Sequence, residues 1–403
     1  MTTAEALALL HDTLDCVVEP ESVSVTEALG RILAEAVVAP HDVPPHDNSA
    51  VDGYAVFFDD LEAEGETRLP VIGRATAGHP FDGAARRGAA VRVFTGALMP
   101  DGPDTVLMQE DCGRDGESVI IPVGIKRGAN RRKRGEDITA GSIVLHPGQR
   151  LRPQDLGQAA AAGRRTLRVA AALRVALLST GDELREPGTP LPPGCIYDSN
   201  RYTVSGLLRG LGCSITDLGI LPDKRAVIEQ ALAEAAKAHD LIVTSGGVSV
   251  GEEDHVKQAV EALGSLHLWR LAIRPGRPIA LGQVGAVPFV GLPGNPVAVV
   301  VTFLTIVRPM ILRLMGGTAE APHHFQVRAG FAYKKKKNRR EWLRARLESD
   351  GDGGWRAVKF PREGAGILTS LVEADGLIEL PEEMTELAPG TLVDFLPFSE
   401  VAS

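Results

Sequence analysis

The chain has 403 residues, of which 44% are apolar and 24% are charged, and this ordinary composition excludes a fibrous or disordered protein. Its formal net charge of -9 argues against a general nucleic-acid binder, which would need a basic surface. A chain of this length, at roughly 150 residues per domain, predicts two to four domains. The cysteines form no C-x-x-C pair, so we expect neither a zinc ribbon nor a disulfide scaffold, and this cysteine usage suits a reducing cytoplasm.

The first residues carry acids and no basic region, so we expect no secretory signal and a cytoplasmic protein. Residues 279–307 carry no charge and are long enough to span a bilayer. Three prolines, Pro288, Pro293 and Pro296, interrupt this stretch, with glycines between them. They predict a short strand, a tight turn and a buried helix rather than a membrane span.

The N-terminal part of the chain predicts a helix over residues 4–15 and a second helix toward Glu35, opened by a capping box of Ser24 and Glu27. Short β-like runs separated by Gly, Pro and Asp turns follow at 69–76, 89–97, 105–111 and 118–123. They predict a small all-β unit. A short helix is expected over residues 153–163.

Residues 172–316 alternate between apolar strands and helices. We expect strands at 173–179, 213–218, 241–244, 266–272 and 287–292, and helices at 200–211, 223–238, 254–263 and after 296. This alternation predicts a parallel sheet covered by helices on both faces. After residue 322 the runs alternate again and predict a second small β domain.

Three loops at the carboxyl edge of the predicted sheet are unusual and contain glycine, at residues 179–184, 244–251 and 291–296. Ligands of open α/β sheets bind beyond this edge, and free backbone N–H groups there can seat a phosphate. The alternative, that the glycines only form tight turns, remains open. Neither a Walker P-loop nor G-x-G-x-x-G occurs. The candidate binding residues are Thr180, Gly181, Ser245, Gly246, Gly247, Ser249, Pro293, Gly294, Asn295 and Pro296.

Acidic side chains follow three predicted strands, at Glu183, Asp223 and Asp254. Acids beside a phosphate often hold Mg2+, so we expect a magnesium site at this edge. For any one of them, a helix cap or a solvated turn is the alternative.

Basic side chains gather around a strand end and its loop, at Arg270, Arg274 and Arg277. Planar guanidinium groups suit the bidentate binding of oxyanions, so we expect an anion site here. The basic runs at 126–134 and 334–340 are local features of an acidic protein, and for the lysine run we favour a solvated face.

These loops and several other segments together resemble the MoeA family of molybdopterin molybdenumtransferases. The matching segments are DNSAVDGYAV (47–56), FTGALMP (94–100), RRKRGED (131–137), STGDEL (179–184), YDSNRY (197–202), TSGGVSVGEEDHV (244–256), LAIRPGRP (271–278) and GLPGNP (291–296). They follow the family's order over nearly the whole chain, which makes the resemblance specific.

The resemblance implies a multidomain α/β plus β fold. Its parts are an elongated linker domain with N-terminal helices (1–40 and 141–171), an inserted β domain (41–140), a MogA-like α/β molybdopterin-binding domain (172–322) and a C-terminal β-barrel-like domain (323–403). It also implies a homodimer in which two subunits share each active cleft.

The implied reaction takes adenylylated molybdopterin and molybdate, inserts the metal at the dithiolene and releases AMP, with Mg2+. Acceptor proteins for the molybdenum cofactor are candidate partners, whereas nucleic acids and membranes are not. Two alternatives stay open: a molybdopterin adenylyltransferase, and a non-catalytic pterin-binding scaffold. The extra domains and GLPGNP argue against the adenylyltransferase.

The family's functional residues can be carried over by motif. Its acids fall on Asp52, Asp137, Glu183, Asp223 and Asp254, and a threonine of the inserted domain falls on Thr95. Asp52 and Asp137 would come from the other subunit of the dimer. Basic positions that are often lysine in the family are Arg270, Arg274 and Arg277 here, and an arginine near the oxyanion maps to Arg344. Where the family often shows Gly-Ser, this chain has Gly364-Ala365-Gly366. One hydroxyl contact to molybdate that the resemblance implies therefore has no serine to make it here.

Overall fold

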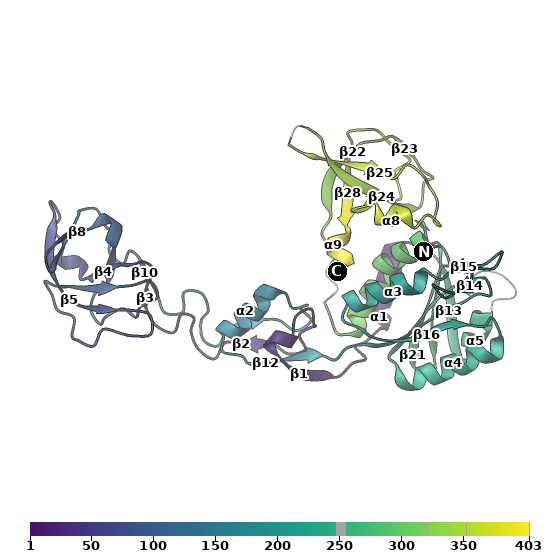
Figure 1. The fold of residues 1–403 in the computed structure, drawn as a ribbon, viewed down its shortest axis with the longest axis horizontal. Coiled ribbons are helices and arrows are strands. Elements are labelled where there is room, and N and C mark those ends of the chain that lie inside the picture. Colours follow the sequence, from purple (N-terminus) through teal and green to yellow (C-terminus); the bar gives the residue numbers. More distant parts are fainter. Residues whose placement is uncertain (247–254, 319–320, 352, 403) are drawn as a thin grey trace.

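The structure, a computed structural model, describes residues 1–246, 255–318, 321–351 and 353–402. The molecule is elongated, with a small β unit at one end, a slender middle piece, and an α/β unit beside a β barrel at the other end (Figure 1). This multidomain α/β plus β architecture confirms the predicted fold class. The predicted domain boundaries stay predictions.

The middle piece, called the linker below, is made of two distant parts of the chain. Strand β1 (Pro20–Ser24) pairs with β12 (Thr166–Ala170), and β2 (Val37–Val38) pairs with β11 (Ile143–Leu145), each pair antiparallel. Helix α2 (Pro153–Ala161) covers them. The first helix, α1 (Thr3–Thr13), begins at a capping box of Thr2 and Glu5 and packs against α7 (Arg308–Leu314) of the α/β unit.

The prediction of a helix running toward Glu35 was wrong. The capping box of Ser24 and Glu27 is present, but only the 3-10 turn η1 (Val25–Glu27) follows it. Gly30 adopts φ +74°, which ends any helix, and the next residues form β-bridges to the other half of the linker. A local helix-start signal was therefore overridden by pairing with a distant segment.

The distal β unit confirms the expected small β domain. Its six-stranded sheet has the order β7-β4-β6-β5-β9-β8. The strands are β4 (Gly53–Val56), β5 (Thr67–Ala75), β6 (Ala90–Val93), β7 (Thr105–Met108), β8 (Gly113–Asp115) and β9 (Ser118–Ile121). A separate pair, β3 (Asn48–Ser49) with β10 (Arg131–Arg132), lies beside it.

The α/β unit is built on a six-stranded sheet in the order β16-β13-β17-β21-β20-β18. Alternate residues of its strand β13 (Arg174–Thr180) enter different cores: Val175 and Leu177 pack toward α3 and α6, whereas Ala176 and Leu178 pack toward α4 and α5. Helices therefore cover both faces, as predicted. The other parallel strands are β16 (Ser214–Leu221), β17 (Leu241–Ser245) and β21 (Val287–Leu292), and the helices are α3 (Asn200–Gly210), α4 (Arg225–Ala238), α5 (His255–Leu263) and α6 (Pro296–Thr302).

The sheet is mixed rather than wholly parallel, which corrects the sequence-based expectation. Strand β20 (Pro278–Val284) was not predicted, because most of it lies within the long apolar stretch at residues 279–307. It forms a tight antiparallel hairpin with β21 around Gly285. Strand β18 (Gly264–Arg270) pairs antiparallel with β20 at the edge. A two-residue connection cannot make a parallel crossover, so the hairpin fixes the reversed direction.

The apolar helix after Pro296 is buried. It continues through the π-helical turn η4 (Phe303–Val307) into α7 (Arg308–Leu314). Among the described residues, this helix alone has the length and hydropathy to cross a membrane, yet 78% of its most apolar 18-residue window lies inside the protein. Phe303, Ile306 and Val307 are fully buried in the core below the sheet, as expected of a core helix.

The C-terminal strands form a closed five-stranded barrel, which confirms the predicted C-terminal β domain. They are β22 (Phe325–Ala329), β24 (Arg340–Ser349), β25 (Trp355–Lys359), β26 (Gly376–Leu380) and β28 (Leu392–Pro397). The pairing of β24 with both β25 and β26 closes the barrel. Strand β19 (Ile273–Arg274) of the α/β unit adds to β24, and so joins the two units.

Candidate functional site

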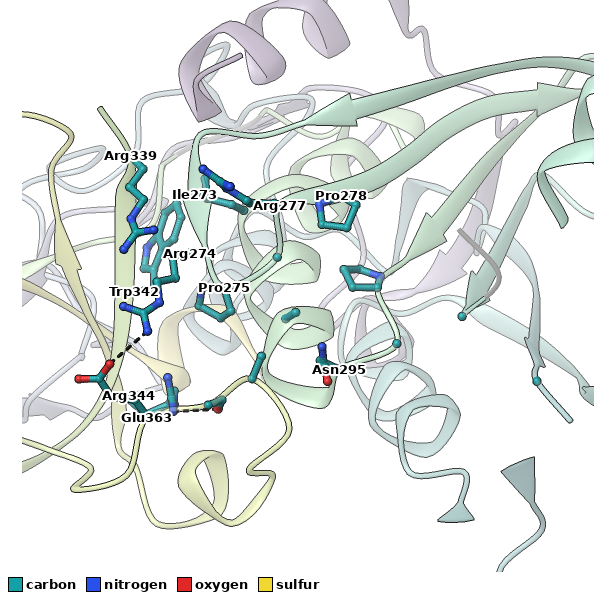
Figure 2. Close-up of a pocket in the computed structure, with 18 of the residues that line it drawn as sticks. Ile273, Arg274, Pro275, Arg277, Pro278, Asn295, Arg339, Trp342, Arg344 and Glu363 are labelled. Carbon is teal, nitrogen blue, oxygen red and sulfur yellow. Dashed lines mark hydrogen bonds and ion pairs between the residues drawn. The ribbon is translucent and has the colours of Figure 1, made fainter. Parts of the chain in front are cut away.

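A cleft of about 740 Å3 lies where the carboxyl edge of the α/β sheet meets the barrel (Figure 2). Loops after β13, β17 and β21 form one wall, while β19, its following loop, β24 and the loop at residues 363–365 form the other. Most of the predicted binding residues meet here. Those that line the cleft are Thr180, Gly181, Glu183, Asp223, Gly246, Arg274, Arg277, Pro293, Gly294, Asn295 and Arg344.

Gly246 lets the ends of β13 and β17 approach each other closely. It has φ +87°, and a Cβ there would lie 2.8 Å from the carbonyl oxygen of Thr180, so a larger residue would push these two strand ends apart. Gly181 has φ +146°, and a Cβ there would lie 2.5 Å from Oε2 of Glu183 in the same loop, so a larger residue would displace that carboxylate.

Buried hydroxyl groups without protein partners stand at the same strand ends. The Oγ atoms of Ser179, Thr180 and Thr244 are buried and make no hydrogen bond in the part of the chain that the structure describes. Unsatisfied buried polar groups are costly and uncommon. Since Thr180 lines the cleft, its hydroxyl can hydrogen-bond a ligand oxygen there.

Two carboxylates, of Glu183 and Asp223, line the cleft beside these loops. Neither forms an ion pair among residues 1–246, 255–318, 321–351 and 353–402. The same residues contain no group of three or more side chains arranged to hold a metal. The third predicted acid, Asp254, lies outside the described residues, as do Gly247 and Ser249.

Arg344 on β24 carries a buried positive charge at the barrel side of the cleft. Its side chain is 7% exposed, and its Nε–H donates to Oγ of Ser370 at 3.0 Å while Nη2 donates to the carbonyl oxygen of Gly364 at 3.2 Å. Both acceptors are neutral, and no described carboxylate pairs with it. Burial lowers the pKa of its guanidinium group. The charge of the nearby Glu363 acts on this guanidinium group, but its described hydrogen bonds go to neutral acceptors, so the group can still bind an anion.

Arg274, unlike Arg344, forms ion pairs with carboxylates. Its Nη2 donates to Oε2 of Glu363 at 3.1 Å, and its Nη1 donates to the hydroxyl of Tyr333 at 3.1 Å and to Oε2 of Glu341 at 3.4 Å. Burial acts to lower the pKa of Arg274, but these neighbours outweigh it and raise that pKa. Figure 2 shows Glu363 reaching Arg274 from the barrel side, with Asn295 across the cleft.

Glu341 is a buried residue that the motifs did not predict, and it bonds to the cleft residue Arg274 without lining the cleft itself. Its carboxylate is fully buried and accepts from Tyr333 at 2.9 Å and from Arg339 at 2.6 Å. Burial and the bond to Glu341 raise the pKa of Tyr333 to about 12. An acid in register with the apolar Leu343 and Ala345 of β24 was the signal that could have revealed it.

Several predicted residues do not reach the cleft. Arg270 is exposed at the end of β18, and Ser245 and Pro296 lie next to lining residues without lining the cleft themselves. Three others belong to the distal β unit and its connections, at the far end of the same chain from the cleft (Figure 1). They are Asp52, Thr95 and Asp137.

Asp52 and Thr95 do lie together. Oδ1 of Asp52 accepts hydrogen bonds from the backbone N–H and from the hydroxyl of Thr95, both at 2.8 Å. These bonds lower the pKa of Asp52. Asp137 is exposed and carries its charge at the surface. The distal unit therefore presents acids, but not to the cleft of its own chain.

Comparisons with known proteins match the chain along its whole length. Three family profiles fit in succession: the MoeA N-terminal region (domain I and II) at residues 1–163, a probable molybdopterin binding domain at 176–313 and the MoeA C-terminal region (domain IV) at 326–398. The chain is 38% identical to the molybdopterin molybdenumtransferase of Haemophilus influenzae, over 100% of this chain and 99% of that protein. It is 35% identical to molybdopterin molybdenumtransferase 2 of Mycobacterium tuberculosis, over 92% and 93%.

A solved structure shares the overall fold. The crystal structure of the molybdopterin biosynthesis MoeA protein from Pyrococcus horikoshii OT3 superposes with a TM-score of 0.84 at 28% identity. It covers 98% of this chain and 99% of its own.

Proposed function

The chain belongs to the MoeA family of molybdopterin molybdenumtransferases, and on that premise we propose that it inserts molybdenum from molybdate into adenylylated molybdopterin and releases AMP. Its place is in molybdenum cofactor biosynthesis, as a transferase. The observation that carries the proposal is the cleft itself. The buried Arg344, which has no ion pair among the described residues, faces glycine-rich loops and the carboxylates of Glu183 and Asp223 across one cavity.

The arrangement suits two anionic reactants held side by side. Molybdate is a dianion, and the second substrate carries phosphates, so the two repel each other in water. Cleavage of a phosphate anhydride depends chiefly on positioning and on neutralising this charge, so no covalent nucleophile is required of the protein.

We assign the molybdate end of the cleft to the arginines. Arg344 has no carboxylate partner in the described chain, and Arg277 is exposed and lines the cleft. Arg274 stands between them with acidic partners, and Arg270 lies beyond the cleft on β18. Guanidinium forks can bind two oxygens of one oxyanion and so fix its orientation.

The opposite wall would hold the phosphates of the pterin nucleotide. Its backbone N–H groups and the hydroxyl of Thr180 can donate to phosphate oxygens. The remaining predicted loop residues belong to the same proposal. They are Gly181, Ser245, Gly246, Gly247, Ser249, Pro293, Gly294, Asn295 and Pro296.

Magnesium fits this wall. Mg2+ prefers oxygen ligands and is usually held by one or two carboxylates together with substrate phosphates. Glu183 and Asp223 offer two carboxylates in the cleft. Asp254, which precedes α5 in the sequence, is the third acid of the proposal. When bound, the ion would neutralise charge on the phosphates.

We propose a homodimer in which the distal β unit of a second copy completes each cleft. This supplies Asp52, Asp137 and Thr95, which the shape of a single chain keeps away from its own cleft (Figure 1). We further propose a cytoplasmic enzyme that hands its product to acceptor proteins and uses neither nucleic acid nor a membrane.

The experiment is AMP release from adenylylated molybdopterin, measured with and without molybdate and Mg2+. We expect release to require both, and Glu183→Gln to reduce it strongly because a magnesium ligand is lost. Glu261→Gln, an exposed glutamate on α5 outside the cleft, is the matched control and should behave as wild type.

Two results would count against the proposal. AMP release without molybdate would show that the two substrates do not react together in the way that the proposal requires. Adenylylation of free molybdopterin by ATP would instead favour the adenylyltransferase alternative.

A further inference from the structure

Three consecutive residues of one loop occupy two hydrogen-bond donors that line the cleft, on Arg274 and Arg344, and a buried one next to it, the N–H of Val297. The donors come from separate elements, on β19, on β24 and at the start of α6, so they converge only in the folded protein. The bonds are Glu363 Oε2 with Arg274 Nη2 at 3.1 Å, the carbonyl oxygen of Gly364 with Arg344 Nη2 at 3.2 Å, and the carbonyl oxygen of Ala365 with the N–H of Val297 at 2.9 Å.

The loop thus offers the cleft what an oxyanion would offer, several acceptor oxygens set close together with a negative charge. Only Glu363 brings the charge, since the other two acceptors are backbone carbonyl groups. The side chains of Glu363 and Arg274 are 45% and 43% exposed, so their ion pair is open to solvent and can exchange.

Both members of this pair have a second partner. Arg274 is also held by Tyr333 and by the buried Glu341, so it would keep its position if Glu363 left. Glu363 also lies 3.4 Å from Nζ of Lys359, on the barrel side. Exchange of Glu363 for another anion would therefore leave no charge without a partner.

We propose that Glu363 is an internal competitor for the oxyanion substrate. Its carboxylate occupies Arg274 in the free protein, yields when the oxyanion binds, and so sets the affinity for molybdate. This inference rests on the proposed function, because it takes the arginine end of the cleft as the molybdate site.

The test is a calorimetric titration of molybdate into the full chain at fixed ionic strength. Glu363→Gln keeps the size of the side chain and removes its charge. Loss of a half-exposed competing ion pair should tighten molybdate binding about two- to fivefold. Glu373→Gln is the control, because Glu373 is exposed at the end of α8 (Thr369–Val372), outside the cleft, and its replacement changes the net charge equally.

The outcomes are distinct, given that thermal unfolding shows both variants folded. Tighter binding by Glu363→Gln alone supports the proposal. Equal dissociation constants for wild type and Glu363→Gln, weaker binding by Glu363→Gln, or equal tightening by both variants would overturn it. Failure of every protein to bind molybdate would overturn this inference together with the oxyanion site of the proposed function. The three overturning results named before it concern Glu363 alone and leave the oxyanion site of the proposed function intact.

Discussion

At the scale of single residues, the partners of an arginine decide what it can do. Arg201 is buried among the carboxylates of Asp198, Asp217 and Glu186, so its charge is neutralised by ion pairs inside the protein. Arg344 is equally buried but has only neutral acceptors. Arg201 therefore stabilises the fold, whereas Arg344 can still attract an anionic ligand.

Ser370 is predicted to position Arg344. Its fully buried hydroxyl accepts from Arg344 Nε and donates to the carbonyl oxygen of Ile367 at 2.6 Å, which fixes the orientation of the guanidinium group. Ser370→Ala removes a hydrogen bond to a charged group, worth ~1.5–3 kcal/mol. We expect the KM for molybdate to rise about 10- to 150-fold, with the KM for the pterin nucleotide nearly unchanged, in steady-state kinetics.

The control for this prediction is Thr369→Ala, the exposed neighbour on the same short helix, which should leave both KM values unchanged. An equal rise of both KM values in Ser370→Ala would point to general loosening of the barrel and contradict a positioning role.

Motifs led to some of these residues and not to others. Glu183 sits in the matched segment at residues 179–184, and the family resemblance mapped an arginine near the oxyanion to Arg344, so both were predictable. Glu363 contacts Arg274 across 89 positions of the chain, and Glu341 does so across 67. Such contacts depend on the closure of the barrel against β19, which no local pattern encodes.

At the scale of elements, a small flap carries Glu183. Strand β14 (Leu184–Arg185) pairs in parallel with β15 (Ile196–Tyr197), directly after the loop that holds this acid. Arg201 on α3 bonds to Glu186 next to the flap, to Asp198 just after it, and to Asp217 on β16. One buried side chain thus ties the flap to the sheet.

Arg201→Met is expected to lower the free energy of unfolding by ~3–5 kcal/mol. The reason is that Asp198, only 2% exposed, would stay buried without its partner. Urea denaturation checks this. Arg209→Met, an exposed arginine on the same helix, is the control and should change stability by less than ~0.5 kcal/mol. A loss below about 1 kcal/mol for Arg201→Met would show that the tie is dispensable.

The same cluster predicts a pH dependence. Burial acts to raise the pKa of Asp217, but hydrogen bonds from Arg201 and from the N–H of Gly219 outweigh it, so the pKa lies below its usual value. A depressed carboxyl pKa stabilises the fold above the unfolded pKa of about 3.9, and this stability is lost as the pH falls through the folded pKa.

Thermal unfolding from pH 3 to pH 7 measures this effect. Asp217→Asn should unfold at a lower temperature than wild type at neutral pH, and the difference should shrink below about pH 4. A difference that stays constant down to pH 3 would contradict the assignment.

Elements with a long, regular pattern were predictable, and those decided by tertiary pairing were not. The strand–helix alternation of residues 172–316 gave the α/β unit because each segment carries its own periodicity. Strand β20 lay inside an uninterrupted apolar stretch, so nothing marked its start. The turn at Gly30 ended a helix that a correct capping signal had opened.

At the scale of the whole molecule, the shape separates residues that the proposed reaction needs together. The linker holds the distal β unit away from the cleft through two short strand pairs, β1 with β12 and β2 with β11 (Figure 1). A second copy related by twofold symmetry can place its distal unit at the cleft, and the reverse contact then forms by the same operation. Two equivalent shared clefts follow.

Subunit mixing tests this arrangement. Asp52→Asn damages only the distal contribution, and Glu183→Gln damages only the α/β contribution, so each homodimer should be inactive. In a mixed dimer of shared clefts, one cleft combines both damaged parts and the other is intact. With random assortment about half of the dimers are mixed, so about a quarter of wild-type AMP release should return. A mixture of Asp52→Asn with Asp137→Asn damages every cleft and should stay inactive. If both acids instead served the cleft of their own chain, the first mixture would recover nothing, because each of its clefts would retain one damaged acid.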